Sequence, residues 1–475
     1  MASVVPTLPQ DPMLPQLAAL FDHAGLAARL DAHFLQLAPG AALRVLACEI
    51  ERVKFRPGRN CVVGYCLRVQ AGGRRRMQRL TLCMYTAEEA RERYARHARA
   101  QRSEAAPFLP AVSLLAGIDA LCWLFPHDRK VTSLPALTDQ GLMRNVLMPQ
   151  VVQARWGDVW QLHKQRSNIV SYFPEHGCTV RVRCYLRHRS LPRQRVWTVY
   201  GHMCHDDTGA RTFATMQRLE AGREQRPSQV GFARPVLYDA SLRLLWQEGV
   251  DAPTLDAALR AAPHDRALWR RVVCAAAYLH GQDCPSPRQV DDALLCAEFE
   301  QVQAAARRAL PSAAERIDAL VQRLLASMPP APARAATLHG DLHSKNILVG
   351  ENSVTLIDLD RVSRGNALAE SGGLLAEIAY RDCVARRPVA WRLLFELARV
   401  HRDILRDGVP LSAYAWHTAA ALVRERAYRS LTSLKPGRLV ALDALLDTAT
   451  ALLDFATRQR GFAAPLCPTS LREAG

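Results

Sequence analysis

One stretch of the C-terminal half decides the fold: Leu338-His339-Gly340-Asp341-Leu342-His343-Ser344-Lys345-Asn346-Ile347-Leu348-Val349, then Val354-Thr355-Leu356-Ile357-Asp358-Leu359-Asp360. Its apolar runs, 347–349 and 354–357, are typical of short buried strands, and 350–353 has the composition of a tight turn. We therefore predict a β-hairpin. Such a hairpin places Asn346 near Asp358, with Asp341 on the loop just before.

Two carboxylates and an amide thus present oxygen atoms to one place. Mg²⁺ prefers oxygen ligands, and it completes its shell with water and phosphate. A further carboxylate can accept the proton of a hydroxyl group or orient that group toward a γ-phosphate. Phosphoryl transfer needs little beyond such positioning and charge neutralisation. The residues therefore predict a phosphotransferase site.

The pattern H-G-D-x-H-x-x-N-I-L, with the first aspartate of I-D-L-D twelve residues after the asparagine, resembles the aminoglycoside phosphotransferase and choline kinase group of kinase-like enzymes. The resemblance is strong over 338–360 and weaker over about 160–400. It implies an α+β, two-lobed protein-kinase-like fold with a β-rich small lobe and a helical large lobe. The implied activity is ATP-dependent transfer of the γ-phosphate to a hydroxyl of a small molecule.

The resemblance also assigns roles to the residues of this stretch. It makes Asp341 the catalytic base, and His339 would brace the loop of that base. Asn346 and Asp358 would hold Mg²⁺, with Asp360 supporting the metal or the substrate. The implied cofactors are ATP and Mg²⁺.

The nucleotide-binding residues follow from the same resemblance. The segment 245–250 is similar to the hinge whose backbone binds adenine, which assigns Gln247, Glu248 and Val250 to the nucleotide. Glu370 falls where the family places an aspartate that anchors the catalytic loop. The sequence does not distinguish ATP from GTP.

One departure from the family concerns the lysine that grips the α- and β-phosphates. His202 stands at about that position, and histidine is mostly neutral near pH 7. Lys164 or Arg183 on a neighbouring strand are alternatives. Two interpretations follow: an active small-molecule kinase, or a weakened or inactive pseudokinase that acts as a nucleotide-binding or interaction module.

An internal repeat precedes this region. The segment 54–63 resembles 171–180: an aromatic residue is followed by proline and then by cysteine that leads into alternating apolar positions. Each copy continues with a further strand, an arginine-bearing helix and a strand pair closing on tryptophan. We predict a duplicated β-rich module, with copies near 41–145 and 155–250. In the first copy, Cys83 or Met84 stands where the lysine is expected.

From Leu255 onward, apolar residues recur at helical spacing. One predicted helix, 258–280, resembles the family's helix before the catalytic loop. A β-rich half followed by a helical half indicates an α+β layout. We expect an N-terminal degenerate small-lobe-like module at 1–150, a nucleotide-binding small lobe at 151–250 and a helical large lobe at 251–475.

Composition limits the partners. The net charge of +17 comes almost entirely from scattered arginines, without an aromatic platform or recognition helix, so nucleic-acid binding is not favoured. The absence of a long apolar run argues against a membrane span. Thirteen scattered cysteines without C-x-x-C spacing predict reduced thiols and a cytoplasmic location.

Because the chain is basic, we expect a neutral or anionic hydroxyl acceptor rather than a polycation. The oligomeric state cannot be deduced.

Overall fold

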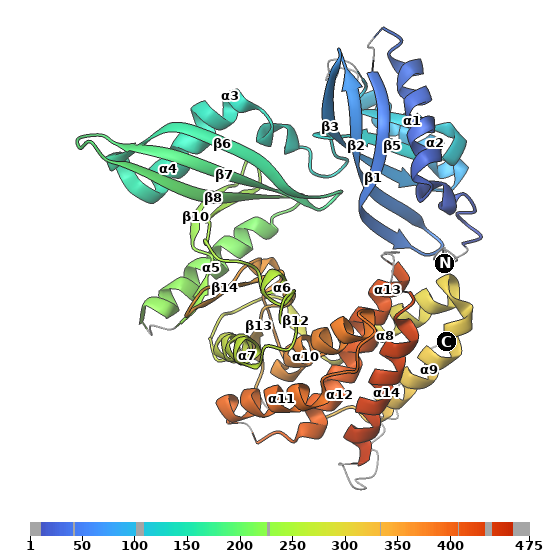
Figure 1. The fold of residues 1–475 in the computed structure, drawn as a ribbon, viewed down its shortest axis with the longest axis vertical. Coiled ribbons are helices and arrows are strands. Elements are labelled where there is room, and N and C mark those ends of the chain that lie inside the picture. Colours follow the sequence, from blue (N-terminus) through green and yellow to red (C-terminus); the bar gives the residue numbers. More distant parts are fainter. Residues whose placement is uncertain are drawn as a thin grey trace.

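The computed structural model describes residues 11–40, 43–100, 109–225, 229–332, 334–406, 408–432 and 439–458. Two five-stranded sheets lie beside each other, and helices lie below them (Figure 1). We call these units the N-terminal module (residues 11–124), the second module (128–248) and the helical region (251–458).

The N-terminal module has the strand order β1-β2-β3-β5-β4. Alternate residues of β2, from Cys61 to Val69, are buried beneath the first helix, because successive side chains of a strand point to opposite faces. The second helix covers the other face near Val62. Its elements are α1(His23–Leu37), β1(Leu43–Arg56), β2(Asn60–Ala71), β3(Arg74–Met84), α2(Ala87–Ala100), β4(Val112–Leu115) and β5(Ala120–Leu124).

The second module repeats this topology in the order β6-β7-β8-β11-β10. Its first three strands have 14, 12 and 11 residues, the same lengths as β1, β2 and β3. Its elements are α3(Gln140–Leu142), the π-helical η4(Met143–Leu147), α4(Met148–Trp156), β6(Trp160–Phe173), β7(Gly177–His188), β8(Gln194–Cys204), α5(Thr208–Gln225), β10(Pro235–Asp239) and β11(Leu244–Glu248). The structure therefore supports the predicted duplication.

The repeat begins earlier than its predicted limits of 41 and 155. Asp22 and Asp139 each cap the first helix of their module by accepting a hydrogen bond from a backbone N–H three residues later. A 3-10 helix precedes each cap, η1(Leu17–Leu20) and η3(Leu134–Leu137). Sequence alternation could not reveal this part, because its apolar residues lie on short helical turns.

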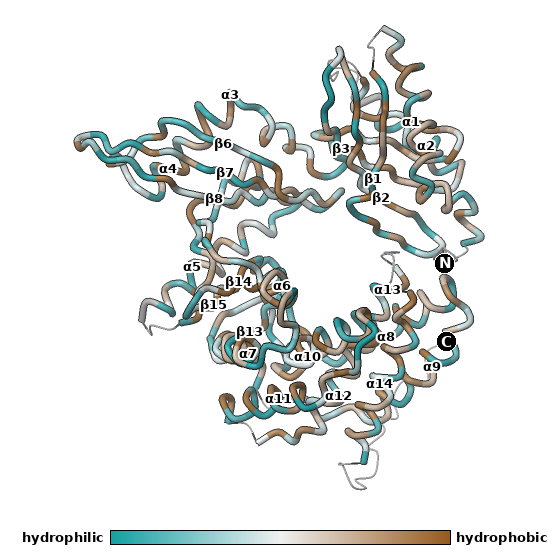
Figure 2. Tube along the Cα trace, viewed as in Figure 1, coloured by the Kyte–Doolittle hydropathy of each residue, from teal (hydrophilic) through white to brown (hydrophobic). Residues whose placement is uncertain are grey.

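The limits of the three expected domains stay predictions. Residues from Val131 to Val152 pack in one core with Val180, Val182 and Trp246 of the second sheet. We therefore propose a limit between 124 and 128 rather than at 150. Figure 2 shows the corresponding apolar segments of α4 beside the strands of the second module.

The helical region contains one large core and two small sheets, β12-β16-β13 and β14-β15-β9, and the strand β9 of the second sheet comes from the second module. The predicted helix 258–280 begins later, because Pro263 interrupts it and Asp265 caps the new start. The helices are α6(Leu255–Ala258), α7(Arg266–His280), α8(Asp292–Ala309), α9(Pro311–Ala326), α10(Ala367–Val384), α11(Trp391–Leu405), α12(Leu411–Ala421), η7(Leu422–Ala427), α13(Tyr428–Thr432) and α14(Leu442–Arg458). The short strands are β9(Val230–Phe232), β12(Gln289–Val290), β13(Ala336–Leu338), β14(Ile347–Val349), β15(Val354–Leu356) and β16(Ser363–Gly365).

Within the described residues, none of the helices combines the length and apolar character that crossing a membrane requires.

Candidate active site

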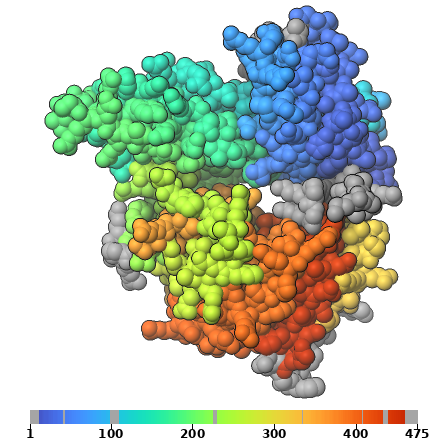
Figure 3. All heavy atoms as spheres, viewed as in Figure 1, coloured from blue at the N-terminus to red at the C-terminus, as the bar shows by residue number. Residues whose placement is uncertain are grey.

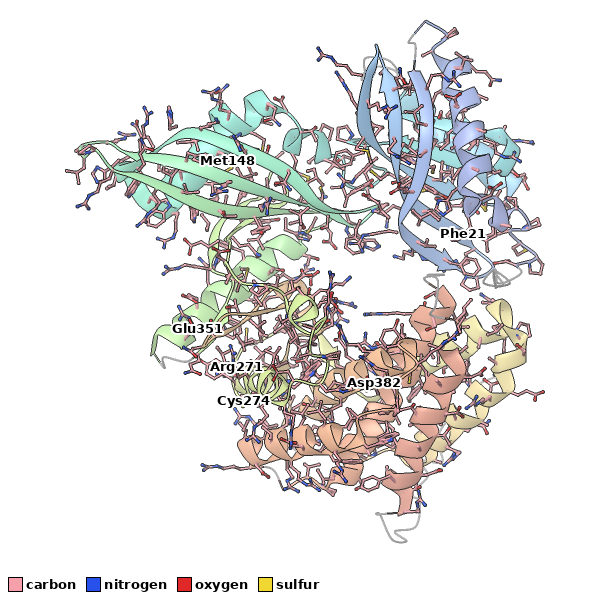
Figure 4. All side chains as sticks on the ribbon, viewed as in Figure 1. Phe21, Met148, Arg271, Cys274, Glu351 and Asp382 are labelled. Carbon is pink, nitrogen blue, oxygen red and sulfur yellow. The ribbon has the colours of Figure 1, made fainter. Side chains whose placement is uncertain are left out.

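The predicted hairpin at 347–356 is present. β14 pairs antiparallel with β15, and Arg271 of α7 donates hydrogen bonds to the carbonyls of Gly350 (2.6 Å) and Ser353 (2.9 Å) in the connecting turn. Figure 4 shows Arg271 near Glu351 of this turn. The hairpin is therefore fixed to the helix that precedes the catalytic loop.

The loop 339–341 is anchored by Glu370 of α10. One carboxylate oxygen accepts a hydrogen bond from the backbone N–H of His339 (3.0 Å) and the other from that of Gly340 (2.8 Å). Gly340 has a φ of +81°, and a Cβ there would lie 2.0 Å from the carbonyl oxygen of Arg361, so only glycine fits. The predicted anchoring role of Glu370 is confirmed.

Glu370 is the first member of a buried polar network. His280 Nε2 lies 3.0 Å from its carboxylate, and His280 Nδ1 lies 3.0 Å from His401 Nε2. The chain continues to the hydroxyl group of Tyr414, 2.8 Å from His401 Nδ1. Burial disfavours the charge of Glu370, but His280 and His339, including the backbone N–H of His339, together outweigh burial and lower the carboxyl pKa. Burial, assisted by His280, lowers the pKa of His401 to about 3. The charged Glu370 carboxylate is thus linked through His280 to a neutral His401.

His339 is fully buried, and its Nε2 lies 2.9 Å from the carbonyl oxygen of Ile357. A side chain without exposed surface cannot touch a substrate. His339 therefore positions the loop against the end of β15, in agreement with its predicted bracing role.

Asn346 and Asp341 meet as the hairpin requires. The Asn346 amide donates a hydrogen bond to the backbone carbonyl of Asp341 (3.1 Å), and the Asn346 carbonyl accepts one from the N–H of Ile357 (3.0 Å). Asp358 follows directly, with a φ of +66° that turns the chain away from the strand. A strained backbone in this left-handed region is common at functional sites.

Negative charge accumulates beside this hairpin. Burial, followed by the nearby charge of Asp358, raises the pKa of Asp360 to about 7. The oxygen donors of Asn346, Asp358 and Asp360 suit a hard cation such as Mg²⁺, which would relieve this repulsion. Among the described residues no group of three or more His, Cys, Asp and Glu side chains is arranged to hold a metal. A cation here would therefore depend on few protein ligands, completed by phosphate and water.

Basic side chains flank the Asp341 carboxylate. His343 Nε2 lies 3.8 Å from one of its oxygens, and Arg429 Nη2 lies 3.5 Å from the other. Burial opposes ionisation, but His343, Arg429 and Arg361 outweigh it and lower the pKa of Asp341. The side chain is therefore an ionised acceptor at neutral pH. Sequence periodicity gave no signal for Arg429, which lies 88 residues away.

His202 lies on β8, on the sheet face turned toward Asp358. Its Nδ1 is 2.9 Å from the hydroxyl group of Thr179 on β7. Burial lowers the pKa of His202, and the negative charge of Asp358 opposes this shift only in part. The alternatives Lys164 and Arg183 have exposed side chains on β6 and β7, and Arg183 lies over the Tyr185 ring, 5.9 Å from its centre.

The predicted hinge residues end β11. Gln247 pairs with Tyr200 of β8, on the face that carries His202. The Glu248 carboxylate binds Arg155 of α4 on the opposite face, and its N–H donates to the carbonyl of Arg234 (2.8 Å). Val250 follows and is half-buried. Any contact of Glu248 with a nucleotide would therefore use its backbone.

Residues 205–401 match the model of the APH phosphotransferase enzyme family. The predicted resemblance is thereby confirmed, as is the fold class of a kinase-like α+β chain with an antiparallel small-lobe-like sheet and a helical C-terminal region. A search of curated proteins gave no significant match.

Several solved structures are similar. A thermostable mutant of aminoglycoside phosphotransferase APH(4)-Ia, bound to AMP-PNP and hygromycin B, has a TM-score of 0.42 and 12% identity, over 65% of this chain and 97% of that one. A choline/ethanolamine kinase family protein from Mesorhizobium loti has a TM-score of 0.39 and 13% identity, over 57% and 85%. Choline kinase from Cryptosporidium parvum has a TM-score of 0.38 and 12% identity, over 62% and 89%.

Proposed function

We propose that this protein is a small-molecule kinase that transfers the γ-phosphate of ATP to a hydroxyl group. The observation that carries the proposal is the convergence of Asp341, Asn346 and Asp358 on a loop whose backbone Glu370 anchors. All four residues lie within the segment that matches the phosphotransferase family. Phosphoryl transfer requires this kind of positioning more than it requires covalent chemistry.

Asp341 would accept the proton of the acceptor hydroxyl or orient that hydroxyl in line with the γ-phosphate. Its lowered pKa keeps the carboxylate ionised for this role. Asn346 and Asp358, with Asp360 in support, would hold Mg²⁺, which neutralises phosphate charge when it is bound. The end of β11, with Gln247, Glu248 and Val250, would bind the adenine through its backbone.

The acceptor would be neutral or anionic. Arg429 lies against Asp341, and Arg361 and Arg288 lie within electrostatic range of the same carboxylate. A polycationic acceptor would meet repulsion here, whereas a sugar or a phosphorylated metabolite would not. Clear preference for a polycationic antibiotic over such compounds in an acceptor screen would contradict this part of the proposal.

His202 supports a second candidate function, a weakened or inactive pseudokinase that binds nucleotide or a partner. Its pKa is lowered, so it supplies no permanent cation for the phosphates.

The expected cytoplasmic location belongs to the proposal as well, since buried thiols such as Cys61 and Cys178 are reduced in this structure.

The first test is the thermal midpoint of the purified protein with and without Mg·ATP, with Asp358→Asn in parallel. A ligand at 100 times its Kd stabilises the folded state by about 2.7 kcal/mol. We expect a metal-dependent rise that the variant loses. Asp341→Asn should keep the rise and lose at least about 100-fold in phosphotransfer, because it removes a proton acceptor and leaves the nucleotide site intact. Nucleotide binding without turnover of any acceptor would favour the pseudokinase. No nucleotide binding would exclude the kinase and leave only a pseudokinase that binds a partner.

A further inference from the structure

The turn between β6 and β7 is held by Asp128 and Arg129 at the start of the second module, in the segment that connects it to the N-terminal module (the connector). Glu175 has a φ of +66°, a left-handed conformation that side chains other than glycine rarely adopt. Its N–H donates a hydrogen bond to Asp128 Oδ2 (2.8 Å), and its carboxylate pairs with Arg129 Nε (2.7 Å). Asp128 Oδ2 also accepts a hydrogen bond from the Tyr172 hydroxyl (2.6 Å). These contacts from the connector thus hold the turn in its strained backbone conformation.

Strand β1 of the N-terminal module holds the same turn from its other side. The Lys54 ammonium lies 2.6 Å from His176 Nε2, and the Arg52 guanidinium lies 3.2 Å from the centre of the Phe173 ring. Figure 3 shows the two modules packed against each other. A cation over an aromatic face adds attraction at such a contact.

The turn lies over the face of the N-terminal module that corresponds to the nucleotide face of the second module. Cys83 pairs with Val62 and Leu121 as His202 pairs with Thr179 and Leu245. Burial raises the pKa of the Cys83 thiol, and the nearby charges of Glu175 and Asp128 raise it further. In the second module this face would bind the nucleotide. In the N-terminal module the corresponding face, which carries Cys83, is covered by the β6–β7 turn of the second module.

The N-terminal module is fixed on its far side as well. Ala309, at the end of α8, belongs to the apolar core of this module, and Arg308 donates a hydrogen bond to the Pro57 carbonyl (3.2 Å). The module therefore contacts both the β6–β7 turn and the helical region, and it can hold the turn at a set distance from the catalytic loop.

The other end of the turn reaches the candidate nucleotide site. A Cβ at Gly177 would make ordinary van der Waals contact with the His202 imidazole (3.5 Å), and His205 donates its backbone N–H to the His176 carbonyl (3.1 Å). His202, which stands at the expected phosphate-binding position, also has its Nδ1 2.9 Å from the hydroxyl group of Thr179, the second residue after Gly177. A displacement of this turn would therefore be felt where the phosphates bind.

We propose that the N-terminal module and its connector position the β6–β7 turn over the nucleotide, with Arg129 and Lys54 as the positioning residues. This inference rests on the proposed function, since it assigns the nucleotide to the face of His202.

The test uses the full chain and two readouts. Hydrogen exchange of the amides 173–178 measures the turn directly, and KM for ATP measures its consequence. Arg129→Ala and Lys54→Met are compared with Arg189→Ala, an exposed arginine at the opposite end of the sheet that pairs with Asp158 at 3.9 Å. We expect about tenfold faster exchange and about a fivefold higher KM for ATP in the first two, with the KM for the acceptor unchanged.

Rescue separates positioning from general stability. Arg129→Lys should restore most of the affinity for ATP, and Glu175→Gln combined with Arg129→Ala should be no worse than either single change, because the two groups act as one pair. Unchanged exchange in Arg129→Ala would overturn the proposal, and so would faster exchange with an unchanged KM. If the wild-type protein bound no nucleotide, the proposed function would fail, while the exchange data would still decide whether these residues hold the turn.

Discussion

The two modules share a topology but differ at the position that would face the nucleotide in the proposed kinase. Cys83 and His202 occupy equivalent places on the third strand, each between a strand of the first hairpin and a leucine of the last. Cys83 is 1% exposed and packs with Val62, Leu121 and Ala90 of α2. His202 instead lies beside the hydroxyl of Thr179 and within reach of the Asp358 charge.

This difference shows that the sheet alone does not make the site. The first three strands of the two modules have equal lengths, but the second module adjoins the hairpin of Asn346 and Asp358. Through β9, which pairs with β15, the second module is joined to that hairpin by backbone hydrogen bonds. The N-terminal module has filled its corresponding face with apolar side chains, which stabilise it without a ligand.

The largest expected effect on stability comes from placing a lysine at each of these two positions, as Cys83→Lys and His202→Lys. Cys83→Lys would bury an ammonium group and overpack an apolar cluster, and Glu175 and Asp128 nearby would offset only part of the penalty. We expect a loss of about 3–5 kcal/mol in the free energy of unfolding. His202→Lys should cost about 1 kcal/mol or less, because Asp358 faces the new charge, and it should tighten Mg·ATP binding about tenfold.

Urea unfolding and nucleotide titration measure both variants, and Cys83→Ser and His202→Gln are the matched neutral controls. If Cys83→Lys and His202→Lys lost equal amounts of stability, the two sheet faces would not differ in the way that the residues around Cys83 and His202 indicate. Weaker Mg·ATP binding in His202→Lys would show that the histidine is itself the better phosphate ligand.

A second contrast lies in the two aspartates that hold the first turns. Asp11 Oδ2 accepts a hydrogen bond from the N–H of Gly58 (2.7 Å), as Asp128 Oδ2 does from that of Glu175 (2.8 Å). Asp128 also satisfies the buried Tyr172 hydroxyl. Asp128→Ala should therefore cost about 2–4 kcal/mol and Asp11→Ala about 1–2 kcal/mol, because buried donors without partners are expensive.

Thermal midpoints measured in the same buffer show which of Asp128→Ala and Asp11→Ala is less stable. The variant Tyr172→Phe tests whether the Tyr172 hydroxyl group causes the difference. If the extra cost of Asp128→Ala comes from the stranded hydroxyl group, it should shrink in the Tyr172→Phe background. An Asp11→Ala variant less stable than Asp128→Ala would contradict the comparison.

Local pattern was sufficient for the catalytic hairpin and for most strands and helices. The pairing of β14 with β15, the position of Asn346 and the helices from α8 to α11 all follow from periodicity and turn composition. The role of Glu370 followed only from family resemblance. It is fulfilled by hydrogen bonds that no spacing rule contains.

Contacts between distant segments could not be predicted. Arg429 reaches Asp341 from the last third of the chain, and Arg129 reaches Glu175 from a connector without periodicity. The turn Pro174-Glu175-His176-Gly177 contains a glutamate whose charge would be unfavourable above bound phosphates. Its carboxylate is instead neutralised by Arg129, which only tertiary structure reveals.

The smallest expected effect concerns the left-handed residue of each turn. Gly58 has a φ of +70° and Glu175 a φ of +66°. A Cβ at Gly58 would meet Arg308 only at 3.7 Å, so Gly58→Ala should cost about 1 kcal/mol through backbone strain alone. Glu175→Gly removes similar strain but also the ion pair with Arg129, so its stability should stay within about 1 kcal/mol of wild type. Urea midpoints at constant m-value measure both changes. If Glu175→Gly were clearly more stable and its KM for ATP unchanged, the strained glutamate would have no part in holding the nucleotide site. If it were equally stable with a raised KM, the strain would be maintained for the position of the turn.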